Sequence, residues 1–207
     1  PRWNLKSEVD NRRFMNINNI SDEKLIDLVL KDDSYYIYLM KRYEGKLSRY
    51  IRRLLVSSDE DIEDILQEVF IKAYKNLNSF DKNQKFSSWI YRISHNEAIS
   101  YYRKIKARPS VVSFEEDFDI FELLPDQTNL EKEAEAEITK MSVAKVLDTL
   151  KPKYKSVLVL RYLEEKNYNE ISYILKKPKG TVATLINRAK QLFKKAAEKQ
   201  IPKNERP

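Results

Sequence analysis

Apolar side chains recur at three- and four-residue spacing through most of this chain, and no segment alternates with the two-residue period of a β-strand. The clearest case begins at Ser58, which with Asp61 forms a capping pattern in front of one continuous apolar stripe. The stripe consists of Ile62, Ile65, Leu66, Val69, Phe70, Ala73 and Leu77. Helices with such stripes are stable only when the stripes pack against one another, so the sequence predicts an all-α fold.

The N-terminal part, residues 21–104, is predicted to be a compact bundle of four helices. Ser21 is a suitable N-cap, with acidic residues in the turn after it. A polar interruption at 76–85 separates the third helix from the fourth. The helices are expected at 21–30, 34–56, 58–77 and 87–104.

The C-terminal part, residues 139–198, shows a second set of helical stripes. Pro152 is suited to the first turn of a helix, and the next core face is expected from Val157, Leu158, Leu160, Tyr162 and Leu163. A short helix at 168–175 and a longer basic one at 178–198 follow across a tight turn. This order is typical of a helix-turn-helix, whose second helix enters the major groove of DNA.

Charge is distributed unevenly over the 207 residues, although the net charge is only +7. Residues 1–104 carry 19 basic and 16 acidic side chains, residues 105–138 carry 3 and 10, and residues 139–207 carry 17 and 6. The sequence therefore predicts two small helical domains joined by an acidic flexible linker at 105–138. The basic block indicates nucleic acid as a partner, with a solvated lysine-rich surface as the alternative. Residues 1–20, where Met15 could be a natural start, and 199–207 are interpreted as tails.

Composition argues against most enzyme classes. The chain has no cysteine, one histidine and two glycines, so thiol chemistry, a histidine-rich metal site and a glycine-rich phosphate loop are not expected. No apolar run approaches a membrane span, and no signal peptide is recognisable. We expect no cofactor, no metal, no membrane insertion and no catalytic activity of its own.

Three segments in order resemble the extracytoplasmic-function (ECF) group of bacterial sigma factors, a group of the sigma-70 family. Residues 61–74 (DIEDILQEVFIKAY) resemble region 2.2, and residues 86–96 (FSSWIYRISHN) resemble regions 2.3 and 2.4. Region 4.2 has its counterpart in three short segments that resemble it: RYL at 161–163, YNEI at 168–171 and PKGTV at 178–182. The resemblance implies a transcription initiation factor that binds core RNA polymerase, recognises the −10 and −35 promoter elements and promotes melting of the duplex.

For polymerase binding, the resemblance implies the acidic and polar ridge of the third helix. Three- and four-residue spacing places its members on one exposed strip, where they could meet a basic helical partner. The alternative is a solvated face on which Glu68 pairs with Lys72. The implied contact residues are Asp61, Asp64, Gln67 and Glu68.

For the −10 element, the resemblance implies that the loop at 76–85 holds a flipped-out base of the melted non-template strand. Lys82, Lys85, Arg92 and Arg103 could hold backbone phosphates. Removing a base from the stack costs a few kcal/mol, which stacking and edge hydrogen bonds must return. Phe80 and Phe86 are available as apolar walls, while the helical register of Trp89 favours a core role over a stacking platform. His95 is expected to be a surface contact. The candidate residues are Asn78, Phe80, Asp81, Lys82, Asn83, Lys85, Phe86, Arg92, His95, Asn96 and Arg103.

For the −35 element, the resemblance implies the last helix and the turn before it. Ala183 and Leu185 stand where the family is usually basic, which predicts fewer phosphate contacts. Lys176 stands where the turn usually has glycine, and with Lys177 and Lys179 it could compensate for the lost charges. The candidate residues are Lys176, Lys177, Lys179, Thr181, Thr184, Asn187, Arg188 and Lys190.

Two other functions remain open at this point. One is a helix-turn-helix regulator whose N-terminal bundle is a sensor or dimerisation domain, and the other is a divergent interaction protein that titrates polymerase. The acidic linker could mimic nucleic acid in the polymerase, screen the basic C-terminal domain, or be simple disorder. The family implies a cytoplasmic protein at the nucleoid, and an anti-sigma partner that could hold it near the membrane.

Overall fold

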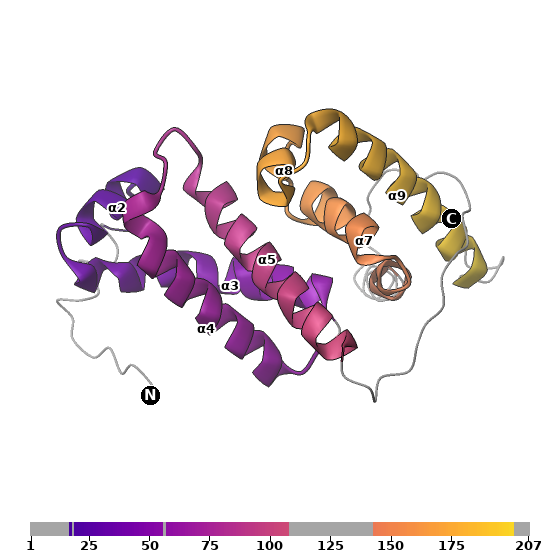
Figure 1. The fold of residues 1–207 in the computed structure, drawn as a ribbon, viewed down its shortest axis with the longest axis horizontal. Coiled ribbons are helices and arrows are strands. Elements are labelled where there is room, and N and C mark those ends of the chain that lie inside the picture. Colours follow the sequence, from indigo (N-terminus) through magenta and orange to yellow (C-terminus); the bar gives the residue numbers. More distant parts are fainter. Residues whose placement is uncertain (1–16, 18, 56, 108–142, 201–207) are drawn as a thin grey trace, which may run out of the picture. The chain divides into compact units, whose positions relative to one another are not determined.

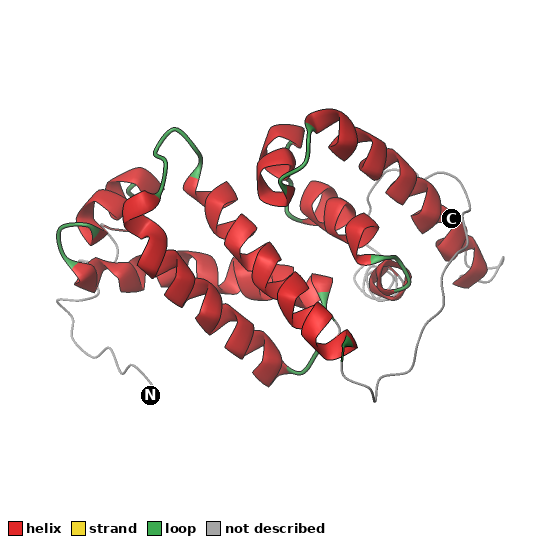
Figure 2. Ribbon diagram, in the orientation of Figure 1, coloured by secondary structure: helices red, strands yellow, loops and turns green. Residues whose placement is uncertain are grey.

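The computed structural model describes residues 17, 19–55, 57–107 and 143–200, and all the regular structure in these ranges is helical (Figures 1 and 2). The all-α fold class predicted from the apolar stripes is therefore confirmed for them. Residues 143–148 are also helical. The other elements are α2 (Asp22–Val29), η1 (Asp33–Tyr35), α3 (Tyr36–Leu54), α4 (Asp59–Asn76), η2 (Leu77–Ser79), α5 (Phe86–Lys106), α7 (Pro152–Leu158), η3 (Val159–Leu163), α8 (Tyr168–Leu175) and α9 (Lys179–Gln200).

The chain divides into two compact units, one built from residues 1–51 and 57–100 and the other from residues 52–56 and 101–207. Most of the predicted acidic linker and of the two predicted tails lies outside the described residues. The domain limits 21–104 and 139–198 therefore stay a prediction.

Side-chain caps set where the helices of both units begin. Ser58 and Asp61 form the expected capping box, in which Ser58 Oγ accepts from the Asp61 amide and the Asp61 carboxylate accepts from the Ser58 amide. Asn167 and Glu170 form a second capping box at the start of α8. Ser21 caps α2 as predicted.

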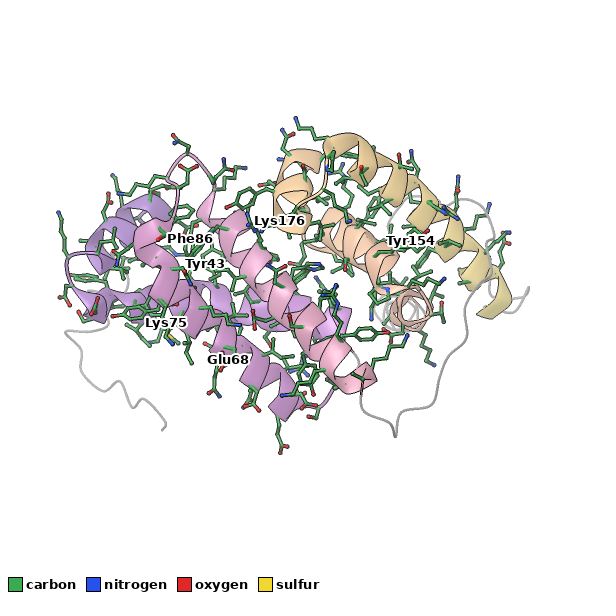
Figure 3. The ribbon with its side chains drawn as sticks, in the orientation of Figure 1. Tyr43, Glu68, Lys75, Phe86, Tyr154 and Lys176 are labelled. Carbon is green, nitrogen blue, oxygen red and sulfur yellow. The ribbon has the colours of Figure 1, made fainter. Side chains whose placement is uncertain are left out.

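The core of the first unit is formed by the apolar faces of α2 to α5. Every member of the predicted α4 stripe is buried. Tyr43 of α3 and Phe86 of α5 lie between the helices (Figure 3), with their rings edge to face at 5.4 Å. Further buried side chains come from the neighbouring helices: Leu25, Ile26, Val29, Leu39, Leu47, Tyr50, Ile51, Ile90, Tyr91 and Ala98.

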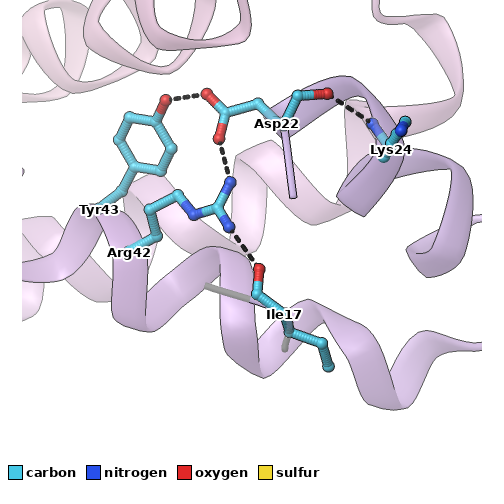
Figure 4. Close-up of polar contacts among 6 residues, drawn as sticks. Ile17, Asp22, Lys24, Arg42 and Tyr43 are labelled. Atoms are coloured by element: carbon cyan, nitrogen blue, oxygen red, sulfur yellow. Dashed lines mark hydrogen bonds and ion pairs between the residues drawn. The ribbon is translucent and has the colours of Figure 1, made fainter. Parts of the chain in front are cut away.

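One polar network joins the start of α2 to α3 (Figure 4). The Asp22 carboxylate accepts a hydrogen bond from Arg42 at 2.7 Å and another from the Tyr43 hydroxyl. Arg42 also donates to the Ile17 carbonyl oxygen at 2.9 Å. Burial, together with the Asp22 carboxylate, raises the pKa of Tyr43, so the phenol keeps its proton and remains a donor.

The second unit is built around contacts of α9 with α7 and α8. Its core includes Val157, Leu158, Leu160, Ile171, Ile174, Val182, Ile186, Ala189 and Phe193. Lys155 of α7 is only 5% exposed, and its ammonium group pairs with Asp148 at 2.6 Å. This ion pair compensates for the cost of burying the lysine charge.

The prediction that Tyr162 and Leu163 belong to the core is wrong. Both are exposed, at 47% and 37%. The helix widens to a π-helix at η3, where the Glu164 amide donates to the Val159 carbonyl oxygen five residues earlier. The wider turn changes the angle between successive side chains, so a stripe extrapolated with a period of 3.6 no longer lies on the core side.

Among the described helices, none is both long and apolar enough to cross a membrane.

Candidate polymerase and nucleic-acid interfaces

The acidic and polar ridge predicted on the third helix lies on the outer face of α4. Asp64, Gln67 and Glu68 are all exposed, and Glu68 is labelled in Figure 3. Asp61 differs from them, because its carboxylate accepts hydrogen bonds from the Ser58 amide and from Ser58 Oγ at 2.8 Å. The structure therefore gives Asp61 a capping role at the end of the ridge.

The alternative Glu68–Lys72 pair is not the contact that the structure records. Lys72 instead donates to Glu97 of α5 at 2.6 Å. This pair links α4 to α5, and Glu68 remains on an exposed position.

The ridge continues into apolar surface. Ile71 is 45% exposed, three residues after Glu68 and seven after Asp64, so it lies on the same face of α4. Tyr74 is 41% exposed, and its ring packs on that of Tyr36 at 5.0 Å. The helical register in the sequence already places Ile71 off the buried stripe, although Ile71 is not among the predicted contact residues.

The loop between α4 and α5 offers polar groups but is itself ordered by them. Asp81 Oδ1 accepts from both the amide and the side-chain nitrogen of Asn83, each at 2.9 Å. Lys82 pairs with Asp27 of α2, and this cation holds the pKa of Asp27 below its usual value. Asn78 and Lys85 are exposed. The predicted loop residues are thus brought together, with Asp81 and Lys82 engaged in local contacts.

Phe80 and Phe86 do not present a face to solvent in this structure. They are 7% and 1% exposed and pack edge to face at 5.5 Å. Trp89 packs on both rings at 5.3 and 5.5 Å and is partly exposed. The two phenylalanines therefore support the loop from the core, and as walls of a base pocket they would have to move.

On α5, the remaining −10 candidates differ in exposure. Asn96 and Arg103 are exposed, whereas Arg92 and His95 are partly buried. His95 was expected at the surface, but its Nδ1 lies 3.0 Å from the hydroxyl of Tyr50, a fully buried side chain of α3. Because this contact is internal, one ring nitrogen of His95 is directed toward the core.

The predicted helix-turn-helix is formed by α8, the turn at 176–178, and α9. Lys176 ends α8 in the left-handed conformation, with φ 51° and ψ 48°. The Lys177 amide donates to the Ser172 carbonyl oxygen at 3.1 Å, and Ser172 Oγ donates back to the Lys177 carbonyl oxygen at 2.6 Å. A lysine in a conformation that favours glycine thus keeps the tight turn.

All the −35 candidates on this motif are exposed: Lys176, Lys177, Lys179, Thr181, Thr184, Asn187, Arg188 and Lys190. Thr184 Oγ1 also donates to the Gly180 carbonyl oxygen at 2.9 Å. Ala183 and Leu185 are partly buried. The exposed face of α9 therefore combines cations with hydroxyl and amide groups, which are the donors that contact phosphates and base edges.

Comparison with known proteins agrees with this geometry. The sigma-70 region 2 family matches residues 39–108, and the sigma-70 region 4 family matches residues 140–193. The ECF RNA polymerase sigma factor SigW of Bacillus subtilis (strain 168) is 35% identical over 169 residues, which cover 79% of this chain and 89% of the relative. The region 2 match argues against a sensor or dimerisation bundle in the N-terminal unit.

Two solved structures share the fold. CnrH, in complex with the cytosolic domain of CnrY, gives a TM-score of 0.64 at 20% identity and covers 87% of this chain and 99% of its own. The sigma factor RpoE from Bartonella quintana, in complex with the anti-sigma factor NepR, gives 0.57 at 20% identity and covers 78% and 96%. The chain is therefore a member of the ECF group of RNA polymerase sigma factors in the sigma-70 family.

Proposed function

We propose that this protein is a transcription initiation factor that binds core RNA polymerase and directs it to promoters with −10 and −35 elements. The observation that carries the proposal is the presence in one chain of both sigma-70 regions, with the predicted ridge residues Asp64, Gln67 and Glu68 and the predicted residues of α9 exposed. Catalysis belongs to the polymerase, and the sigma factor contributes binding and positioning.

Core polymerase binds the ridge of α4 formed by Asp64, Gln67, Glu68 and Ile71. Carboxylates attract a basic partner helix, and the exposed Ile71 supplies the apolar contact that interface centres usually contain. The test is the affinity for purified core polymerase of the wild type and of the Asp64→Ala/Glu68→Ala double variant. Glu44→Ala is a control for the loss of a surface carboxylate, because Glu44 is an exposed acid of α3 and lies on a different helix from the ridge.

The expected result is a weaker complex for the double variant alone. An equal loss for Glu44→Ala would indicate a nonspecific effect of charge, and an unchanged affinity for all three proteins would place the polymerase contact elsewhere.

The −10 element binds at the loop between α4 and α5 and along α5, and the −35 element binds α9. At the −10 element, Asn78, Lys85, Asn96 and Arg103 present exposed polar groups for bases and phosphates. Opening of the duplex follows from capture of an unpaired base there. Permanganate reactivity of thymines in the promoter complex measures this opening, and we expect it to fall in Asn78→Ala while polymerase binding stays constant.

The protein acts in the cytoplasm at the nucleoid, where core RNA polymerase and promoter DNA are found. An anti-sigma protein is a further expected partner, because RpoE of similar fold was solved with one. Such a partner would hold the factor inactive. An anti-sigma protein anchored in the membrane would also keep the factor near the membrane. Co-purification from cells that carry a tagged copy tests for this partner.

A further inference from the structure

The two glycines of the chain stand where the backbone does not need them. Gly45 lies in the middle of α3 and Gly180 lies near the start of α9, and neither has a positive φ angle. Among the described residues, the left-handed conformations are taken by Glu165 and Lys176 instead. Glycine weakens the interior of a helix relative to alanine, so Gly45, in the middle of α3, reduces stability without a backbone reason.

The fold around Gly45 has room for a side chain. A Cβ atom at this position would lie 3.5 Å from Arg49 Nη1, which is an ordinary van der Waals contact, and it would meet no other group within 4 Å. Gly45 is also exposed. Packing within the protein therefore does not explain the glycine, and the backbone of α3 is open to a close approach from outside at this position.

The surroundings of Gly45 are cationic. Lys41 and Arg49 lie one helical turn before and after it on the same face of α3, and Lys46 is exposed beside it. This face is opposite the side that buries Tyr43 and Leu47. Of the charged side chains of α3, six are basic and only Glu44 is acidic, a quarter turn from Gly45.

The chemistry of this face fits a polyanion better than a protein partner. The centres of protein interfaces are depleted of lysine and enriched in aromatic and apolar side chains, whereas Lys41, Gly45 and Arg49 provide only charge and bare backbone. Cations spaced by helical turns around a position without a side chain allow a chain of phosphates to come close to the helix.

We propose that the outward face of α3, formed by Lys41, Gly45 and Arg49, binds the sugar–phosphate backbone of a nucleic acid without reading its sequence. None of these residues belongs to the surfaces proposed for polymerase, the −10 element or the −35 element. This face gives the N-terminal unit a further contact with nucleic acid. The group it binds is the phosphodiester, which duplex and single-stranded nucleic acids both present.

The test measures the salt dependence of binding by the full-length protein without polymerase. Labelled 20-nucleotide probes of mixed sequence, one single-stranded and one duplex, are titrated between 50 and 200 mM salt. The Lys41→Gln/Arg49→Gln variant is compared with Lys24→Gln/Lys31→Gln, which removes two exposed lysines of the same unit outside this face. Gly45→Ala is the third variant.

We expect the slope of log K against log salt to become shallower by about 1.8 on duplex or about 1.4 on single strands in Lys41→Gln/Arg49→Gln, because each phosphate contact contributes roughly 0.9 or 0.7. The probe with the larger effect identifies the form that binds. The control pair should leave both slopes unchanged. Gly45→Ala should raise the Tm by about 2–4 °C and still weaken binding, because its methyl group strengthens the helix but obstructs the approach.

Equal slopes in the two double variants would overturn the proposal, as would a stabilised Gly45→Ala protein with wild-type affinity. Unchanged nucleic-acid affinity of Lys41→Gln/Arg49→Gln, together with a loss of core-polymerase binding in a separate competition assay, would assign the face to a protein partner and would also overturn the proposal. Because these titrations contain no polymerase, their outcome is independent of whether the protein initiates transcription.

Discussion

Ile71 provides a direct test of the α4 ridge, because it is an apolar ridge residue that the fold leaves exposed to solvent. Burying an isoleucine side chain completely contributes about 1.5–3 kcal/mol. Ile71 is 45% exposed, so the part left for a partner to cover corresponds to about 0.7–1.4 kcal/mol. Ile71→Ala should therefore weaken binding to core polymerase by roughly 3- to 10-fold.

The assay is competition of each unlabelled variant with labelled wild-type protein for purified core polymerase. Leu30→Ala is the matched control, because Leu30 is 43% exposed in the same unit but lies after α2, away from the ridge. A urea unfolding curve for each variant separates a loss of contact from a loss of fold. Equal affinities of the two variants, or a loss in Ile71→Ala that follows its unfolding, would refute the assignment of Ile71 to the interface.

Three further predictions concern the stability of the two units, each measured by chemical denaturation. Lys176→Gly should stabilise the protein by about 0.5–1 kcal/mol, because a left-handed lysine costs about 1–2 kcal/mol and the entropy of glycine offsets part of the gain; a lower urea midpoint would contradict this account of the turn. Asp22→Asn should destabilise the first unit by about 1–3 kcal/mol, since Arg42 and Tyr43 lose their shared carboxylate, and Glu23→Gln, also in the first turn of α2, should cost clearly less. Ser94→Ala should raise stability by about 1 kcal/mol, because the Ser94 hydroxyl is fully buried without a hydrogen-bond partner in the described structure; a loss would show that the hydroxyl is satisfied in solution.

The helices and their capped starts followed from the sequence because local chemistry determines them. The apolar stripe of α4 and the Ser58–Asp61 box depend on residues within a few turns of one another, and both are present as predicted. The helix-turn-helix was predictable for the same reason.

The features that could not be predicted from the sequence depend on a shift of helical register or on a partner from another helix. The π-helix at η3 exposes Tyr162 and Leu163, and a constant period of 3.6 could not have located it. Lys72 pairs with Glu97 rather than Glu68, and His95 is directed to Tyr50, because the neighbouring helix, and not the adjacent turn, supplies the partner. The same limit applies to Phe86, whose aromatic character indicated a base pocket although its ring lies in the core.

The most direct test of the central claim is mapping of transcription starts with purified core polymerase on a library of genomic promoter fragments. The account predicts specific starts that require this protein and that share elements near −10 and −35. It also predicts that these starts disappear with Asp64→Ala/Glu68→Ala and persist with Glu44→Ala. Binding to core polymerase without any specific start, or a palindromic footprint formed without polymerase, would contradict the account.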